Sequence, residues 1–180
     1  MKRWNVILDL IDPDQPTNGA EIGVRRAETS SRILKARPKT RMILVDPWKE
    51  YNTADEDRLI GPRLIGQDTC EVRYLSAMRA IAPYVDRATV LRVESLVAAD
   101  LVHTDSLDYV FIDGLHTYEA CMADCLAWFE KLKPGGWLIV HDYCEEFPAV
   151  TRATNIFCKA VKVEGELRAD DCYIVKKPCN

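Results

Sequence analysis

Two short polar clusters directly follow apolar runs of the sequence, and both contain groups that can move a proton or hold a metal ion. In "VFIDGLHTYE", Asp113 and His116 follow an apolar run, and in "WLIVHDY", His141 and Asp142 stand side by side after another. Carboxylates and imidazoles together can bind a divalent cation or take a proton from a hydroxyl. Taken singly, each residue also fits a plain capping or turn role. If both runs are parallel strands, the four side chains should lie at one edge of a sheet.

The elements that would position these clusters alternate along the chain. The strands expected are 20–24, 41–46, 88–93, 107–113 and 137–142. The helices expected are 29–36, 68–84 with a capping box at Asp68 to Glu71, 117–132 and 147–158. A sharp turn is expected at Lys133 to Gly136, and a hairpin of 160–164 with 172–176 around Gly165. Alternating strands and helices predict an α/β fold with a doubly wound parallel sheet.

Three further strand ends carry residues suited to a nucleoside. Gly23 would let the backbone approach a ligand, and Asp46, 23 positions later, can accept hydrogen bonds from two ribose hydroxyls. Glu94 or Ser95 can contact a base edge, although Ser95 also suits a helix cap. The plainer alternatives are an ordinary strand-to-helix turn with Glu21 as a loop acid, and a capping role for Asp46. Together, Gly23 and Asp46 favour a nucleoside-binding site.

Composition limits the remaining possibilities. The chain has 180 residues, of which 48% are hydrophobic, and this predicts a single domain over 1–180. A net charge of −4 without basic clusters argues against a nucleic-acid partner. The apolar runs are too short to span a membrane, and Asp9 interrupts the first of them, so we expect no membrane partner and a cytoplasmic protein.

Seven cysteines are expected to be reduced thiols, since they form no CxxC pair in a chain of this size. Cys121 and Cys125 share a helical face near His116, so a zinc site there is conceivable. Buried cysteines are much commoner on such a face, and that is the interpretation we favour.

The motifs "EIGVRRAETS" and "VDPW", the segment from Phe111 to Tyr143 and the ending "YIVKKP" resemble class I S-adenosylmethionine-dependent methyltransferases. Within that class they are similar to the small O-methyltransferases of the macrocin type. The resemblance covers most of residues 18–178, and the segment 111–143 is its most specific part. It implies a Rossmann-like, doubly wound, seven-stranded sheet, mostly parallel with an antiparallel last strand. It also implies S-adenosylmethionine as the cofactor.

The resemblance assigns a role to each strand end. Glu21 and Gly23 would hold the methionine part of the cofactor, Asp46 the ribose, Glu94 and Ser95 would flank the adenine, and Asp113 would lie near the reacting methyl group.

Some members of this group also bind magnesium, through positions that correspond here to Asp113, His141 and Asp142. A carboxylate is usual at position 141, and the histidine disfavours magnesium or suits another metal such as manganese. Leu115 stands where a catalytic acid can occur, with His116 as the nearest replacement, and Ala27 replaces a glycine. The catalytic candidates are therefore Asp113, His116 and His141, with either a metal or a histidine base removing the proton from the acceptor.

These observations predict O-methylation of a small-molecule hydroxyl, with a possible homodimer. The alternatives are a non-catalytic nucleoside- or S-adenosylmethionine-binding module and an unrelated dinucleotide-binding protein. Residues 47–67 lack a clear period and are expected to form either a lid over the acceptor or a plain surface loop.

Overall fold

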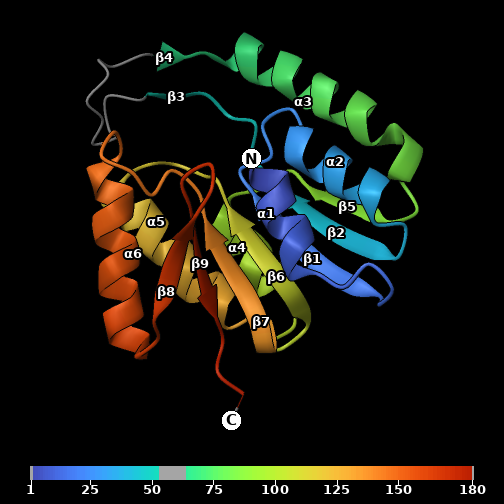
Figure 1. Ribbon diagram of the computed structural model, residues 1–180. Helices are drawn as coiled ribbons and strands as arrows, with labels where there is room; N and C mark the ends of the chain where they lie inside the picture. Colours follow the sequence, from blue (N-terminus) through green and yellow to red (C-terminus); the bar gives the residue numbers. More distant parts are fainter. Residues whose placement is uncertain (1, 53–63, 180) are drawn as a thin grey trace.

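The computed structural model describes residues 2–52 and 64–179, arranged around a central seven-stranded sheet (Figure 1). The strand order is β5-β2-β1-β6-β7-β9-β8. The strands are β1 (Thr17–Ile22), β2 (Thr40–Val45), β5 (Ala88–Leu91), β6 (Leu107–Ile112), β7 (Leu132–Val140), β8 (Gly165–Arg168) and β9 (Cys172–Lys176). The first five are parallel, while β9 is antiparallel to both β7 and β8. The predicted Rossmann-like sheet, mostly parallel with an antiparallel last strand, is confirmed.

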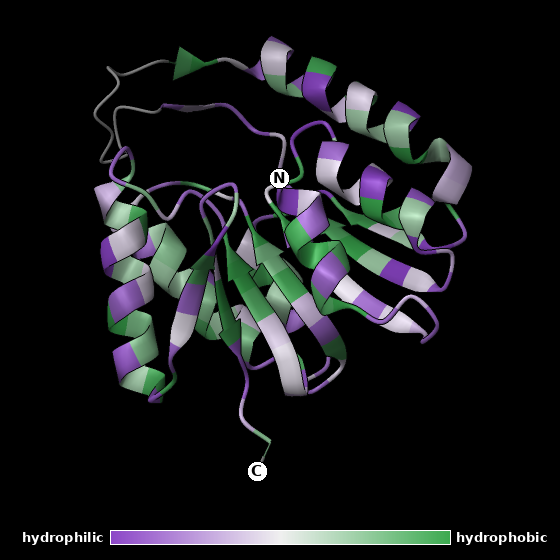
Figure 2. Cartoon of the chain, in the orientation of Figure 1, coloured by the Kyte–Doolittle hydropathy of each residue, from purple (hydrophilic) through white to green (hydrophobic). Residues whose placement is uncertain are grey.

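Helices cover both faces of this sheet (Figure 1). One face carries α1 (Arg3–Leu10), α2 (Glu28–Ala36) and α3 (Gln67–Ile81), and the other carries α4 (Ser95–Asp100), α5 (Tyr118–Phe129) and α6 (Pro148–Val161). A short 3₁₀ helix (Ala82–Tyr84) follows α3. Hydrophobic residues concentrate on the central strands (Figure 2). Within the described residues, no helix has the length and hydrophobicity needed to cross a membrane.

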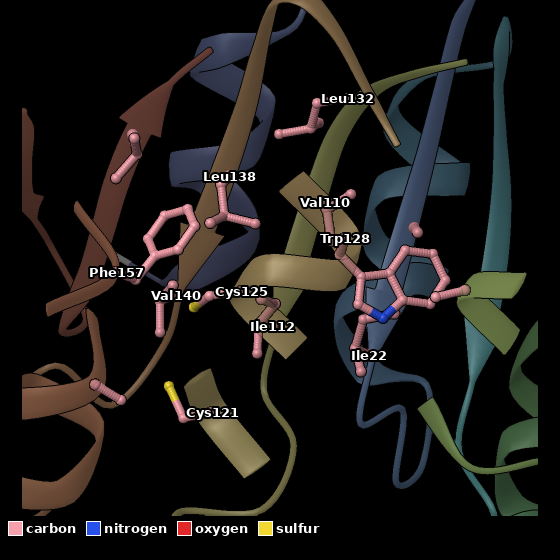
Figure 3. Close-up of a cluster of buried hydrophobic side chains, with 14 of the residues drawn as sticks. Ile22, Val110, Ile112, Cys121, Cys125, Trp128, Leu132, Leu138, Val140 and Phe157 are labelled. Carbon is pink, nitrogen blue, oxygen red and sulfur yellow. The ribbon is translucent and has the colours of Figure 1, made fainter. Parts of the chain in front are cut away.

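The core is divided in two by the sheet, because successive side chains of a strand point to opposite faces. In β6, Val110 and Ile112 face α4, α5 and α6, where they pack near Trp128 and Phe157 (Figure 3). Tyr109, next to Val110 in sequence, belongs to the opposite cluster under α1, α2 and α3. Burying each large apolar side chain contributes roughly 1.5–3 kcal/mol. The central strands, and so the ends of β1, β6 and β7, are therefore held from both sides.

The predicted hairpin is displaced along the chain. Residues 160–161 continue α6, which ends where Lys162 adopts a left-handed conformation with φ 57°. The first hairpin strand is β8, at 165–168, and Asp170 and Asp171 turn the chain with φ of 56° and 51°. The buried Phe157 extends the apolar face of α6 toward its end, and this favours helix over the predicted strand.

Two other local predictions are wrong. The turn expected at Lys133 to Gly136 does not precede β7, because β7 already begins at Leu132. These residues form an irregularity within the strand, whose pairing with β6 resumes at Trp137, and Gly135 has φ 80°. Helix α3 begins after Gly66 without a side-chain cap, so the expected capping box does not form. Glu71 instead accepts hydrogen bonds from Gln67 and Arg92.

The segment 47–67 can be followed only in part, since residues 53–63 lie outside the described ranges. Its two described ends form short strands, β3 (Tyr51–Asn52) and β4 (Leu64–Ile65), which pair antiparallel to each other. The prediction of a lid or a surface loop falls mainly on the residues that are not described.

Candidate active site

The carboxyl ends of the parallel strands form one rim of the sheet, and the predicted site residues lie along it. At the end of β1, Glu21 is buried and accepts a hydrogen bond from the Ser30 hydroxyl of α2. Burial raises the pKa of Glu21 well above its usual range, and the nearby Asp113 carboxylate raises it further. Glu21 therefore links β1 to α2 from inside the protein.

The loop after β1 passes through three left-handed residues: Gly23, Arg25 and Ala27, with φ of 88°, 53° and 58°. A Cβ atom on Gly23 would lie 2.0 Å from the carbonyl oxygen of Asp113, so only glycine fits there. The sequence suggested that Gly23 approaches a ligand; in the structure it contacts the backbone at the end of β6. Ala27 is buried in a conformation that glycine adopts without cost, and the alanine costs roughly 1–2 kcal/mol.

Asp46 follows β2 and is held by backbone amides. Its Oδ2 accepts from the N–H of Arg25 at 2.8 Å and its Oδ1 from the N–H of Trp48 at 2.7 Å. Burial raises the pKa of Asp46, although these two hydrogen bonds lower it. The Trp48 indole donates to the Arg25 carbonyl at 2.9 Å, which ties the loops after β1 and β2 together. Each carboxylate oxygen keeps further acceptor capacity for a ligand hydroxyl.

A cavity of about 490 Å³ opens beside Asp46, between the ends of β2 and β5. It is lined by Pro47, Trp48, Lys49, Gln67, Arg92, Val93, Glu94 and Val97. Its size suits a nucleoside-containing ligand. Glu94 is exposed at the cavity, 3.9 Å from the Lys49 ammonium. The hydroxyl of Ser95 instead accepts from the indole of Trp128 at 2.8 Å, so this side chain is engaged with the core. We call the ends of β1, β2 and β5 the nucleoside side of the rim.

The ends of β6 and β7 bring Asp113, His116, His141 and Asp142 together, and we call these four residues the acid–imidazole cluster. His116 Nε2 lies 2.7 Å from Asp142 Oδ2. His141 Nδ1 lies 3.0 Å from the same oxygen and 3.4 Å from Asp113 Oδ1. The His116 ring also stacks on Phe147, with ring centroids 4.2 Å apart. The structure thus places the four residues side by side, as the sequence suggested; their roles stay predictions.

Opposing effects set the protonation of the cluster. Burial lowers the pKa of His141, but the carboxylates of Asp113 and Asp142 outweigh burial and raise it to about 9. Burial would raise the pKa of Asp142, but the hydrogen bond with His116 and the nearby positive charges of His116 and His141 hold it well below its usual range. Asp142 is therefore an anion throughout the physiological pH range.

The cluster has the features of a cation site. Ligand atoms of Asp113, His141 and Asp142 all lie within 4.8 Å of one another, and they are the one such group found within the described ranges. The buried Nδ1 atom of His141 makes no hydrogen bond to a described residue, because neither carboxylate contact is correctly aligned. Two carboxylate oxygens and an imidazole nitrogen suit Mn²⁺ better than Mg²⁺, which prefers oxygen ligands. These residues fit a divalent cation.

Residues from distant parts of the chain complete the cluster, and the sequence analysis missed them. Arg3, which begins α1, places Nη1 3.3 Å from Asp113 Oδ2 and 3.4 Å from His141 Nε2. Thr29 accepts a hydrogen bond from Arg3 Nε, and Asp170 accepts one from its backbone N–H. Helix α1 itself was not predicted. No local motif marks Arg3, because its role depends on how α1 packs.

The conceivable zinc site does not form among the described residues. Cys121 and Cys125 are buried in the core cluster between α5, α6 and the sheet (Figure 3). Cys121 Sγ contacts Thr154 Oγ1 at 4.0 Å. Neither thiol joins His116 in a ligand group within the part of the chain that the structure describes. These cysteines are core residues, as the favoured interpretation had it.

Comparison with known proteins places this geometry in a family. A family model described as a methyltransferase domain matches residues 20–143, which is more than half of the chain. No match is found among the curated proteins.

Solved methyltransferase structures share the fold at low sequence identity. A Staphylococcus aureus protein assigned as a caffeoyl-CoA O-methyltransferase has a TM-score of 0.70 and 14% identity, over 99% of this chain and 85% of that one. The O-methyltransferase NovP has a TM-score of 0.69 and 18% identity, over 98% and 78%. The N-methyltransferase NodS from Bradyrhizobium japonicum has a TM-score of 0.60 and 14% identity, over 98% and 95%.

The fold and the rim define a class I methyltransferase, dependent on S-adenosylmethionine, as the sequence predicted. The chain belongs to the methyltransferase domain family. The structural neighbours include enzymes named for transfer to oxygen and to nitrogen, so the fold alone does not fix the acceptor atom.

Proposed function

We propose that this methyltransferase transfers the methyl group of S-adenosylmethionine to a hydroxyl oxygen of a small molecule. The observation that carries the proposal is the His116–Asp142 pair, joined at 2.7 Å at the end of the sheet next to Asp113. A hydroxyl must lose its proton to become a good nucleophile, and a positioned imidazole is suited to take it near neutral pH.

The chain's own residues would divide the work along the rim. The nucleoside side holds the cofactor, with Asp46 accepting from the ribose hydroxyls and Glu94 beside the adenine. Asp142 orients the His116 ring and stabilises the imidazolium that forms when the ring takes a proton. The stack of His116 on Phe147 restricts rotation of the ring. Methyl transfer itself then mainly needs in-line alignment of the acceptor with the sulfonium.

A divalent cation is part of the proposal. Asp113, His141 and Asp142 would hold it, and the unaligned, buried Nδ1 of His141 supports this assignment. Such a cation would acidify the acceptor hydroxyl and orient it. The predicted small-molecule acceptor, homodimer and cytoplasmic location, and the absence of a nucleic-acid or membrane partner, stay predictions.

The test has two stages. Calorimetry with S-adenosylmethionine and its demethylated product should show binding, whereas a nicotinamide cofactor should not bind. Transfer of a radiolabelled methyl group to a panel of phenols and sugars is then measured with Mn²⁺, with Mg²⁺ and with a chelator. Transfer to oxygen that the chelator abolishes and Mn²⁺ restores supports the whole proposal; cofactor binding without any transfer would favour the non-catalytic module.

A further inference from the structure

A basic side chain from the first helix lies inside the acid–imidazole cluster. Arg3 Nη1 is 3.3 Å from Asp113 Oδ2, and Arg3 Nε donates to Thr29 Oγ1 at 3.2 Å. Its backbone N–H donates to Asp170 Oδ2 at 2.9 Å. The Arg3 side chain is only 24% exposed and the Asp113 side chain 16%. These contacts fix the guanidinium in place, so Arg3 is a positioned part of the cluster and not a mobile surface charge.

This position conflicts with a metal ion on the same carboxylate. A cation held by Asp113, His141 and Asp142 would share Asp113 with the Arg3 guanidinium. Two cations on one partly buried carboxylate repel each other more strongly than they would in water, because the surroundings screen them less. Each cation therefore lowers the affinity of the site for the other.

The contact between Arg3 and His141 adds a second conflict. Metal binding through Nδ1 requires a neutral ring that carries its proton on Nε2, and this N–H would face Arg3 Nη1 at 3.4 Å. A guanidinium can only donate hydrogen bonds, so two donors would then face each other. Nδ1 is the atom that faces Asp113 and Asp142 and that would bind the metal. The tautomer that a metal on Nδ1 requires is thus the one that Arg3 disfavours.

We propose that Arg3 is the resident cation of this cluster, and that a divalent cation binds there only when the Arg3 guanidinium leaves Asp113. The inference rests on the divalent cation of the proposed function and is independent of the cofactor and the acceptor. Because Arg3 is the first residue of α1, metal binding is coupled to the docking of that helix on the rim. Reciprocity of binding requires that the metal loosen Arg3 as much as Arg3 weakens the metal.

The first experiment measures Mn²⁺ binding by titration calorimetry in the full chain without S-adenosylmethionine. Arg3→Met keeps the length of the side chain and removes its charge, and we expect it to bind Mn²⁺ at least about tenfold more tightly than the wild type. The matched control is Arg32→Met on α2. The Arg32 guanidinium lies 5.6 Å from the ring centre of Trp4 in α1, so this variant removes a charge that contacts the same helix. We expect its affinity to stay within about twofold of the wild type.

The second experiment uses only the wild-type protein. It therefore tests the inference even if helix α1 does not form in Arg3→Met. Hydrogen exchange of the α1 amides should become faster when Mn²⁺ saturates the site, because the helix loses its contact with Asp113. Unchanged or slower exchange would overturn the inference. Equal Mn²⁺ affinity in the wild type and Arg3→Met would also overturn it, while leaving the metal site in place. If no variant binds Mn²⁺, both this inference and the proposed divalent cation site are wrong. The proposed binding of S-adenosylmethionine is unaffected, because it is measured separately.

Discussion

The two sides of the rim satisfy their charged groups in different ways. On the nucleoside side, Asp46 is held by the backbone amides of Arg25 and Trp48, which lie close to it in the loops after β1 and β2. In the acid–imidazole cluster, Asp113 and Asp142 are neutralised by side chains, among them Arg3 from the far end of the sequence. Backbone amides are fixed by the fold, whereas a set of side-chain charges can be rearranged by a ligand or a metal. The nucleoside side is therefore preorganised and the cluster is adjustable.

The largest expected effect separates the two sides by function. His116→Ala should lower the rate of methyl transfer by roughly 10²–10⁴-fold, because the proposed base is lost. Binding of S-adenosylmethionine, measured by calorimetry, should stay unchanged, since His116 lies away from the nucleoside side. His103→Ala, at an exposed position, is the control and should leave the rate unaffected. A full rate in His116→Ala would remove His116 from the mechanism.

A second variant should damage both sides together. Gly23→Ala places a Cβ 2.0 Å from the Asp113 carbonyl oxygen at φ 88°, so we expect a loss of about 3 kcal/mol or more in the free energy of unfolding. Urea denaturation measures this loss, and cofactor and Mn²⁺ affinities should fall in parallel. In Gly66→Ala, the added Cβ meets no described atom within 4 Å, so this control should change little. A stable Gly23→Ala protein would mean that the two loops move independently.

A buried carboxyl group in α5, Asp124, should make the stability of the protein depend on pH. Burial raises the pKa of Asp124 in α5 to about 6, although a hydrogen bond from Ser95 lowers it. The folded state then holds this proton more tightly than the unfolded state, so stability should fall by roughly 2 kcal/mol as pH rises from 4 to 7.

Asp124→Asn should abolish this fall and should be more stable than the wild type at pH 7. Urea unfolding at pH 4 and pH 7 measures the difference, with Asp100→Asn on the exposed end of α4 as the control. A wild-type protein that gains stability between pH 4 and pH 6 relative to Asp124→Asn would contradict the expectation.

A smaller effect, on cofactor affinity, is expected when Asp46 is replaced. Asp46→Ala should weaken S-adenosylmethionine binding roughly tenfold or more, because hydrogen bonds that involve a charged group are worth about 1.5–3 kcal/mol. Mn²⁺ affinity should not change if the two sides are as separate as the contacts indicate. Calorimetry with each ligand provides both values, and Asp100→Ala serves as the control. Unchanged cofactor affinity would take Asp46 out of the site.

On the nucleoside side, the sequence indicated which residues follow the strands, but not all of their contacts. Gly23 and Asp46 act through local geometry, a left-handed turn and an aspartate directly after a strand, and such features leave a local mark in the sequence. The parallel order of the sheet followed from the alternation of strands and helices, together with the family resemblance. The hydrogen bond from the Trp128 indole to the Ser95 hydroxyl could not be predicted from the local sequence, because the two residues are 33 positions apart.

The errors concern segments whose local patterns allow two structures. Residues 160–164 are apolar enough for a strand, yet the packing of Phe157 keeps 160–161 in α6. The glycines at 135 and 136 predicted a turn, but backbone hydrogen bonds with Lys177 keep them within β7. Arg3 could not be recognised at all, because α1 reaches the rim only through the tertiary packing of Val6 and Ile7. Tertiary packing decided each of these cases against the local pattern.

The hydrogen bond from the backbone of Arg3 to Asp170 has a consequence for the order of folding. It joins residues 167 positions apart, so it closes nearly the whole chain into one loop. The chain entropy lost in closing a loop grows with its length, and contacts of this separation are among the last to be gained. The sheet can assemble first from pairs such as β1 with β2, which are close in sequence. We therefore expect α1 to dock late, after the strand ends that it covers are already in place.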